Sequence, residues 1–412
     1  MMTWSCSFKA YKKINYLIIA LAFVSNTGFA LEKSVTKQYR SNYLFQNSSV
    51  DTTPQVWGSV EYLSERIKNE PIDVPLITTS PLGTPRVTAG VINAPGTQIL
   101  FGAGSNQNDI HFNNFNGGRL TLGAWLDCCT HFGVEGSAFA LKEKSTSFQA
   151  SSGNNPILTI PFINSITNHE NAALISFPGI NAGSISVKNS SRLWSWDANG
   201  LLNITSFVPL TNRGNFQIIG LGGFRALTLN EEFTMNSGFT IPSIPAISVN
   251  FSDSFQTRNR FYGVQFGARG SLNYYGFTTD VTTKIALGRN FETQQINGQT
   301  NVSISSGMPT NSKGGVFALN SNIGSFHQSQ FAFMPEIQAR LGYKITPNIH
   351  PYVGYNFLYI NHVIRPANQI NRTINPNEFP PPIPGGSPAP LPVFNTSSYW
   401  AQGVNVGLEI SL

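Results

Sequence analysis

Cysteine is almost absent from this sequence of 412 residues, which has three. Cys6 lies in the N-terminal segment that we expect to be removed. Cys128 and Cys129 are adjacent, so a disulfide between them would be strained and would not hold a fold together. We interpret the pair as an unusual turn feature. Cysteine therefore indicates neither a disulfide scaffold nor a metal or redox centre.

Charge is also scarce. Charged residues make up 11% of the sequence, against about 25% in an ordinary soluble protein. The formal net charge of +6 includes three lysines of the N-terminal segment, and 23 basic against 20 acidic residues remain without them. No run of lysine and arginine interleaved with aromatics is present, so nucleic acid is not an expected partner.

Long hydrophobic runs are missing after residue 30, where no stretch approaches ~18 apolar residues, which excludes a helical inner-membrane protein. The one apolar run, residues 14–24, follows Lys9, Lys12 and Lys13 and precedes small residues ending at Ala30. This order is typical of a cleaved signal peptide. We therefore expect export, a signal peptide over 1–30 and a periplasmic segment over 31–54.

What the sequence does contain is period-2 alternation of apolar and polar residues from residue 55 to the end. Short and long connections between the alternating segments follow each other in turn, which is typical of outer-membrane barrels with short periplasmic turns and long extracellular loops. A soluble β-sandwich has no such alternation of loop lengths. The prediction is an all-β antiparallel transmembrane barrel over 55–412 with about ten strands (range 8–12), at 55–68, 116–127, 131–148, 182–209, 214–234, 249–274, 276–291, 328–345, 349–365 and 397–412.

Each strand has one apolar face for lipid and one polar face for the lumen, since successive side chains point to opposite sides. In the predicted strand 249–274, for example, Tyr262, Val264 and Phe266 alternate with Gln265 and Arg269. Sorting the charged residues by this parity gives ten candidate lumen residues of balanced sign, which we expect to pair across a narrow interior. They are Glu61, Arg119, Glu135, Arg225, Arg269, Asp280, Lys284, Glu336, Arg340 and Glu409.

Several stretches resemble the seventh family of putative β-barrel porins, which are outer-membrane proteins of unproven activity. They include residues 57–63 (WGSVEYL), 75–81 (PLITTSP), 122–127 (LGAWLD), 222–225 (GGFR), 257–263 (TRNRFYG), 284–288 (KIALG) and 353–359 (VGYNFLY). The resemblance covers most of the mature chain. It implies a barrel in the outer membrane and supplies no catalytic residues.

Catalytic and metal-binding patterns are not evident. The six histidines are scattered without metal-ligand spacing, and no nucleophile elbow or phosphate loop occurs. Some ten-stranded outer-membrane barrels are proteases with Asp and His at the outer rim, so we considered Asp253 and His362, which lack a paired partner at short spacing. We predict no enzyme, no cofactor and no metal site. The proline-rich segment 379–392 is expected to be an extended, mostly disordered exterior spacer.

Together these features predict an outer-membrane protein with a porin-like or structural role and a narrow, charge-paired lumen. The alternative is a surface-exposed binding or adhesion protein that displays its long loops, and an outer-membrane hydrolase is the least favoured reading. Expected partners are the outer-membrane lipid and the barrel-assembly machinery, which would act on the C-terminal strand. The sequence does not identify an extracellular ligand.

Overall fold

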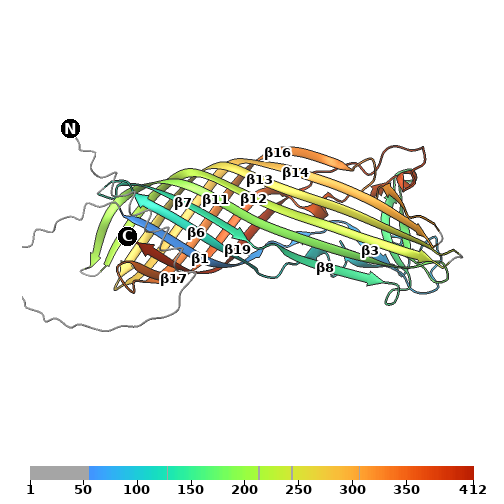
Figure 1. Ribbon diagram of the computed structural model, residues 1–412, viewed down its shortest axis with the longest axis horizontal. Coiled ribbons are helices and arrows are strands. Elements are labelled where there is room, and N and C mark those ends of the chain that lie inside the picture. The colour runs from blue at the N-terminus through green and yellow to red at the C-terminus, as the bar shows by residue number, and fades with distance from the viewer. Residues whose placement is uncertain (1–54, 128, 212–213, 243–244, 306) are drawn as a thin grey trace, which may run out of the picture.

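The computed structural model describes residues 55–127, 129–211, 214–242, 245–305 and 307–412. Its largest unit is an antiparallel β-barrel (Figure 1). The ten strands of the barrel wall are β1 (Val56–Ile67), β6 (Phe115–Trp125), β7 (Phe132–Leu141), β11 (Ala182–Thr211), β12 (Gly214–Ile241), β13 (Ile247–Tyr274), β14 (Phe277–Ile304), β16 (Gly324–Tyr343), β17 (Ile349–Ile364) and β19 (Thr396–Ser411). The predicted all-β barrel with about ten strands is confirmed.

Closure of the barrel depends on the two terminal strands. β1 pairs with β19 on one side, with Trp57 opposite Ser411, and with β6 on the other. The remaining neighbours follow the order of the sequence through β7, β11, β12, β13, β14, β16 and β17. Every strand of the ring therefore has two partners, and no edge is left open to lipid.

Three predicted strands differ from the observed ones. The segment predicted as 131–148 is two strands, β7 and β8 (Lys144–Ser151), which both pair with β11 and are separated at residues 142–143. The predicted strands 214–234 and 276–291 were too short, because β12 and β14 run on to Ile241 and Ile304. The outward positions of these extensions are polar, as at Asn236, Thr240, Gln295 and Asn297, so the apolar pattern that marks a lipid-facing strand ends before the strand does.

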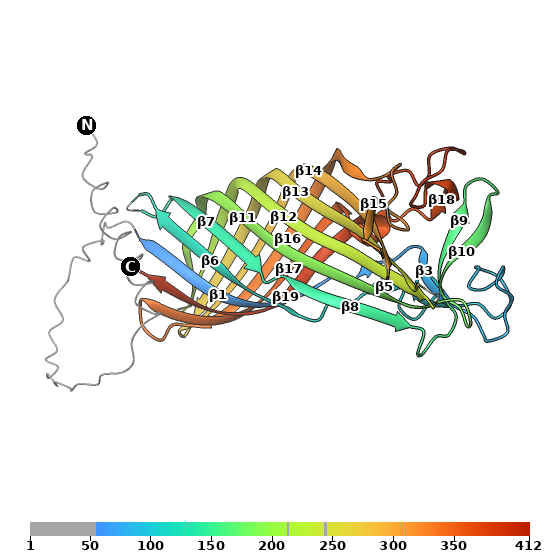
Figure 2. The ribbon, with the colours of Figure 1, turned by 45° about the vertical axis from the view of Figure 1, so that its right-hand side comes forward.

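The long connections fold into an outer cap at the end of the barrel opposite the C-terminus (Figure 2). A small sheet contains β3 (Pro75–Thr79), β4 (Gln98–Gly102), β9 (Leu158–Asn164), β10 (His169–Ser176) and β18 (Thr373–Ile374). Two short strands, β2 (Glu70–Pro71) and β5 (Asp109–Ile110), pair with each other, and β15 (Thr310–Lys313) pairs with β14. The 3-10 helices η1 (Pro366–Gln369) and η2 (Pro376–Glu378) belong to the last long connection.

An apolar plug fills the barrel beneath this cap. The connection between β15 and β16 turns inward, so that Val316, Phe317, Ala318 and Leu319 are all buried. They belong to one apolar cluster with inward-facing side chains of the wall, including Phe233, Phe255, Phe261, Ile296 and Ile360. Sequence parity predicted a polar interior and missed this plug, whose residues 316–319 lie in a connection that carries no strand pattern.

The proline-rich segment contradicts our prediction of disorder, since side chains at its start hold it in one path. The Asn375 amide donates hydrogen bonds to the carbonyl oxygens of Gly385 (2.8 Å) and Ser387 (3.1 Å). The Glu378 carboxylate accepts one from the Ala389 backbone N–H at 3.1 Å. As expected, these residues add no strand to a ladder, but they form an ordered part of the cap.

The outer face of the wall is apolar over a limited height. On β13 and β14, Val264, Phe266, Leu272, Val281 and Ile285 all point outward and are exposed. Such a face is suited to lipid. Among the described residues, no helix is long and apolar enough to cross a membrane. The predicted signal peptide and the segment 31–54 lie outside the described residues.

Candidate functional site: the charged barrel interior

Below the apolar plug, charged side chains from eight wall strands meet in the lumen. This charged girdle consists of five acidic and five basic residues: Glu61, Glu65, Glu135, Asp197, Glu336, Arg119, Arg225, Arg269, Lys284 and Arg340. Eight of them are among the ten predicted lumen residues, and Glu65 and Asp197 are additions. The balance of sign matters because unpaired charges in a narrow lumen would be costly.

Glu61 on β1 is the centre of one half of the girdle. Its carboxylate lies 2.6 Å from Nη2 of Arg340 and 3.3 Å from Nη1 of Arg119, and it accepts a hydrogen bond from the Tyr352 hydroxyl at 3.0 Å. The Asn405 amide also donates to it. Four donors from β6, β16, β17 and β19 thus converge on one buried carboxylate, which ties both sides of the β1–β19 closure together.

Glu336 on β16 is the centre of the other half. It forms an ion pair with Arg225 of β12, lies 3.9 Å from Nη2 of Arg119, and accepts a hydrogen bond from Gln338 at 2.7 Å. Because Arg119 also contacts Glu61, it joins the two halves into one network. The β12 and β16 strands are not neighbours in the ring, so the Arg225–Glu336 pair crosses the lumen.

Asp197 on β11 was not among our predicted lumen residues. Its carboxylate lies 3.2 Å from Nζ of Lys284 and 3.8 Å from Nη1 of Arg225, and it accepts a hydrogen bond from Asn199 at 2.6 Å. The sequence signal for it was present, since Asp197 alternates with the outward Trp194 and Trp196 in the predicted strand 182–209. Glu65 was missed in the same way, and it accepts a hydrogen bond from Asn356.

The two remaining predicted residues, Asp280 and Glu409, lie at the periplasmic end. They line a cavity of about 240 Å³ together with His350, Arg269 and Arg340. Glu409 lies 3.7 Å from Nδ1 of His350. Among the described residues Asp280 forms no ion pair, so it does not belong to the girdle. Since Arg269 and Arg340 also belong to the girdle, the cavity borders the girdle.

A second buried charge cluster lies outside the lipid-facing zone, under the cap. Arg365 forms a bidentate pair with Glu231 at 2.6 and 2.7 Å, and Glu70 lies 3.9 Å from the same guanidinium group. Complete burial raises the pKa of Glu70 to about 8; Arg365 opposes this shift and the Glu231 carboxylate adds to it. Glu70 also accepts a hydrogen bond from the Ala367 backbone N–H at 2.7 Å. This cluster anchors η1 to the wall.

The Asp and His considered for a protease-like site are used structurally. The Asp253 carboxylate is buried and accepts hydrogen bonds from the backbone N–H groups of Val316, Phe317 and Ala318 at 2.7–3.1 Å, which holds the plug loop in place. Nδ1 of His362 lies near the Asn361 amide and the Phe331 carbonyl oxygen. In the part of the chain that the structure describes, no hydrogen bond or ion pair joins Asp253 to His362.

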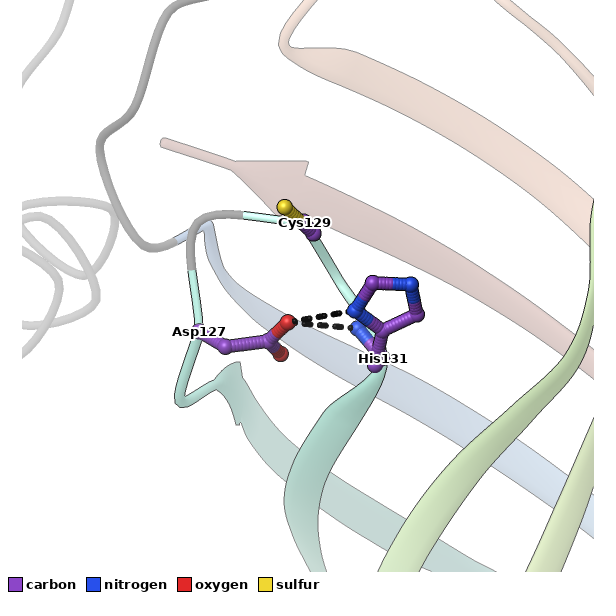
Figure 3. Close-up of side chains that lie close together, drawn as sticks. All are labelled: Asp127, Cys129 and His131. Atoms are coloured by element: carbon purple, nitrogen blue, oxygen red, sulfur yellow. Dashed lines mark hydrogen bonds and ion pairs between the residues drawn. The ribbon is translucent and has the colours of Figure 1, made fainter.

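The periplasmic turn between β6 and β7 contains a group that the sequence search for metal ligands missed (Figure 3). Possible ligand atoms of Asp127, Cys129 and His131 lie within 4.8 Å of one another at an exposed position. The sequence does carry a signal for this group, because Asp127, Cys129 and His131 are three possible ligands at every second position. The Asp127 carboxylate already accepts hydrogen bonds from the backbone N–H groups of His131 (3.0 Å) and Phe132 (2.8 Å). Slight burial alone would raise the pKa of Asp127, but these hydrogen bonds outweigh it and lower the pKa.

Two solved structures resemble this chain at low scores. The outer membrane protease OmpT from Escherichia coli is 8% identical, with a TM-score of 0.36, 88% of this chain covered and 98% of that one. A Pseudomonas aeruginosa FadL homologue is 10% identical, with a TM-score of 0.20, and the comparison covers 88% of this chain and 90% of that one. These scores are too low to support an argument about activity. No curated protein sequence matches the chain.

The family comparison is more extensive. The model described as "Putative beta barrel porin-7" matches residues 57–412, which is the whole barrel and its cap. This agrees with the stretches of sequence that carry the resemblance, and with the ten-stranded ring and outward apolar face. The chain therefore belongs to this family of outer-membrane β-barrel proteins.

Proposed function

We propose that this protein is a closed structural barrel of the outer membrane, which holds a folded cap at the cell surface and passes no steady current at rest. The observation that carries the proposal is that two barriers lie in series in the lumen. The charged girdle crosses the barrel through pairs such as Arg225–Glu336, and the apolar plug around Phe317 lies above it. Ten strands enclose little more space than eight, whose interior is filled by side chains.

The paired charges favour a closed barrel over an open porin. An aqueous channel would hydrate its lining, and long charged side chains could then point along the pore. Here the carboxylates of Glu61 and Glu336 each contact several hydrogen-bond donors, and both residues are at most 3% exposed. No step of chemistry is supported by Asp253 or His362, so the proposed role is not enzymatic. Export through a signal peptide and assembly through β19 complete the proposal.

The experiment that tests this proposal is single-channel recording of the purified full-length mature protein in a planar bilayer. We expect no steady current, with brief openings at most. A large, stable and weakly selective current from the wild-type protein would contradict the closed barrel and support a general diffusion porin.

Surface binding is the second candidate, and the length of the wall favours it. β11 has 30 residues and β12, β13 and β14 have 28 each, whereas a tilted membrane strand needs ~9–11. The cap lies at the far end of these long strands (Figure 2). The discriminating test compares adhesion or ligand capture by cells expressing the full chain with cells expressing a chain in which Gly and Ser replace residues 381–388 of the cap.

A further inference from the structure

On the outer face of the barrel, four arginines gather at one height on neighbouring strands. Arg192 of β11 and Arg258 of β13 both lie opposite Asn230 of β12, so they flank the same residue in one cross-strand row. Arg260 of β13 is one outward position lower, and Arg289 of β14 lies opposite the outward Tyr262. All four side chains are exposed. We call these four residues the arginine patch.

The height of the patch follows from two aromatic rows. Tyr274, Phe277 and Tyr343 are outward at the periplasmic end, and Tyr262, Phe291 and Phe331 are outward below the cap. Twelve residues separate Tyr274 from Tyr262 on β13, a distance of about 40 Å along the strand and about 30 Å along the membrane normal at a typical tilt. Aromatic girdles mark the two interfaces of a barrel. The arginine patch therefore lies at the outer interface.

The patch lacks the carboxylate partners that surface arginines usually have. Among the described residues, none of the four guanidinium groups forms an ion pair; Arg258 donates to the Asn230 side chain at 3.0 Å and Arg289 to the Ser329 hydroxyl at 3.4 Å. Three carboxylates, Glu143, Glu231 and Glu232, line the recess beside the patch, and Glu231 is buried and paired with Arg365. The Oε1 atom of Glu232 accepts hydrogen bonds from Ser254 and Gln256 at 3.1 Å each, and among the described residues this carboxylate forms no ion pair with the arginines.

A groove accompanies these charges. Arg192, Arg258 and Arg260 line a recess of about 520 Å³, together with the amide and hydroxyl side chains of Asn230, Gln256 and Thr293. Guanidinium groups bind phosphate oxygens through paired hydrogen bonds, whereas amides and hydroxyls suit sugar hydroxyl groups. The recess is too polar for acyl chains and borders the face that lipid covers. Its chemistry matches a phosphorylated sugar attached to acyl chains below it.

We propose that the arginine patch is a binding site for the phosphorylated glycolipid of the outer leaflet, with the phosphate held by Arg258, Arg260 and Arg192 and the acyl chains lying on the apolar face below. The site is separate from the closed lumen and does not depend on whether the barrel conducts. Occupancy would fix the barrel's height in the leaflet and cover the boundary between the apolar face and the cap.

The test measures retention of a defined lipid by the purified full-length mature protein in neutral detergent, using native mass spectrometry and thermal unfolding. The probes are the bis-phosphorylated acylated glucosamine disaccharide, its phosphate-free analogue and inorganic phosphate. We expect the phosphorylated lipid alone to be retained and to raise the unfolding temperature. The double variant Arg258→Gln, Arg260→Gln is expected to bind it about 30-fold more weakly, since each cation contributes near an anionic lipid surface.

Two matched variants control for charge and folding. Arg86→Gln with Lys313→Gln removes two exposed cations from the cap and should leave retention unchanged. Arg258→Lys with Arg260→Lys keeps the charge and should retain most of the binding. Equal retention by the wild type and the glutamine variant would overturn the proposal. Equal binding of the phosphate-free analogue would overturn it too, and so would stabilisation by inorganic phosphate alone at the same concentration.

Discussion

The guanidinium group of Arg269 on β13 and the carboxylate of Glu135 on β7 form a bidentate ion pair, with N–O distances of 2.6 and 2.9 Å. Two strands, β11 and β12, separate them in the ring, so the pair braces the wall from inside. Glu135 is buried, and Arg269 receives a further constraint because its Nε donates to the Thr282 hydroxyl at 3.1 Å. The pair closes the periplasmic side of the girdle.

Replacing Arg269 with alanine should destabilise the barrel. The Glu135 carboxylate would stay buried without its partner, which costs about 3–5 kcal/mol when a buried pair is broken. The current should stay low because the apolar plug remains. The measurement is the urea midpoint in detergent micelles, read from the mobility shift between folded and unfolded protein. The double variant Arg269→Gln, Glu135→Gln is the control; if it is no more stable than Arg269→Ala, the cost does not come from an unpaired charge.

Phe317 is the residue to test for the second barrier. Its side chain is fully buried in the plug, so Phe317→Ala should lower the free energy of unfolding by about 3–5 kcal/mol. We expect no steady current from this variant, because the girdle beneath it is intact. A measurable current should need Phe317→Ala combined with Arg340→Ala, because the second substitution removes the ion pair between Arg340 and Glu61. Steady current from Phe317→Ala alone would mean that the girdle does not seal the lumen.

The sequence predicted the strands of the barrel wall better than the contacts of the charged girdle and the apolar plug inside it. Alternation along a strand assigns each side chain to one face, so Glu61, Arg119 and Glu336 could be placed inside before the structure was known. Which charges meet depends on register and on strands that are not neighbours, as with Arg225 and Glu336, and no local pattern encodes that. The plug was missed because Val316 and Phe317 lie in a Gly-rich connection, and burial there is decided by Asp253, 63 residues away.

Cys129 provides a test of orientation, since it is a free, exposed thiol in the turn between β6 and β7. With Cys128 replaced by serine, a membrane-impermeant maleimide should leave Cys129 unlabelled on intact cells and label it after the outer membrane is permeabilised. A cysteine introduced at the exposed Gly385 of the cap should be labelled on intact cells. The measurement is the mass shift of the purified protein. Labelling of Cys129 from outside as readily as position 385 would reverse the assigned orientation.

The buried cluster of Arg365, Glu231 and Glu70 makes stability depend on pH. Burial raises the pKa of Glu70 from 4.5 to about 8, so the folded chain keeps a proton that the unfolded chain loses above pH 4.5. The stabilisation is complete below pH 4.5 and is lost as the pH rises to about 8, by at most about 1.4 kcal/mol for each pH unit. Urea midpoints between pH 4.5 and 9 should therefore fall in the wild type. Glu70→Gln keeps a neutral acceptor for the Ala367 N–H and cannot lose a proton, so its midpoints should fall less over the same range. Identical pH profiles for the two proteins would show that Glu70 is already ionised in the folded cluster.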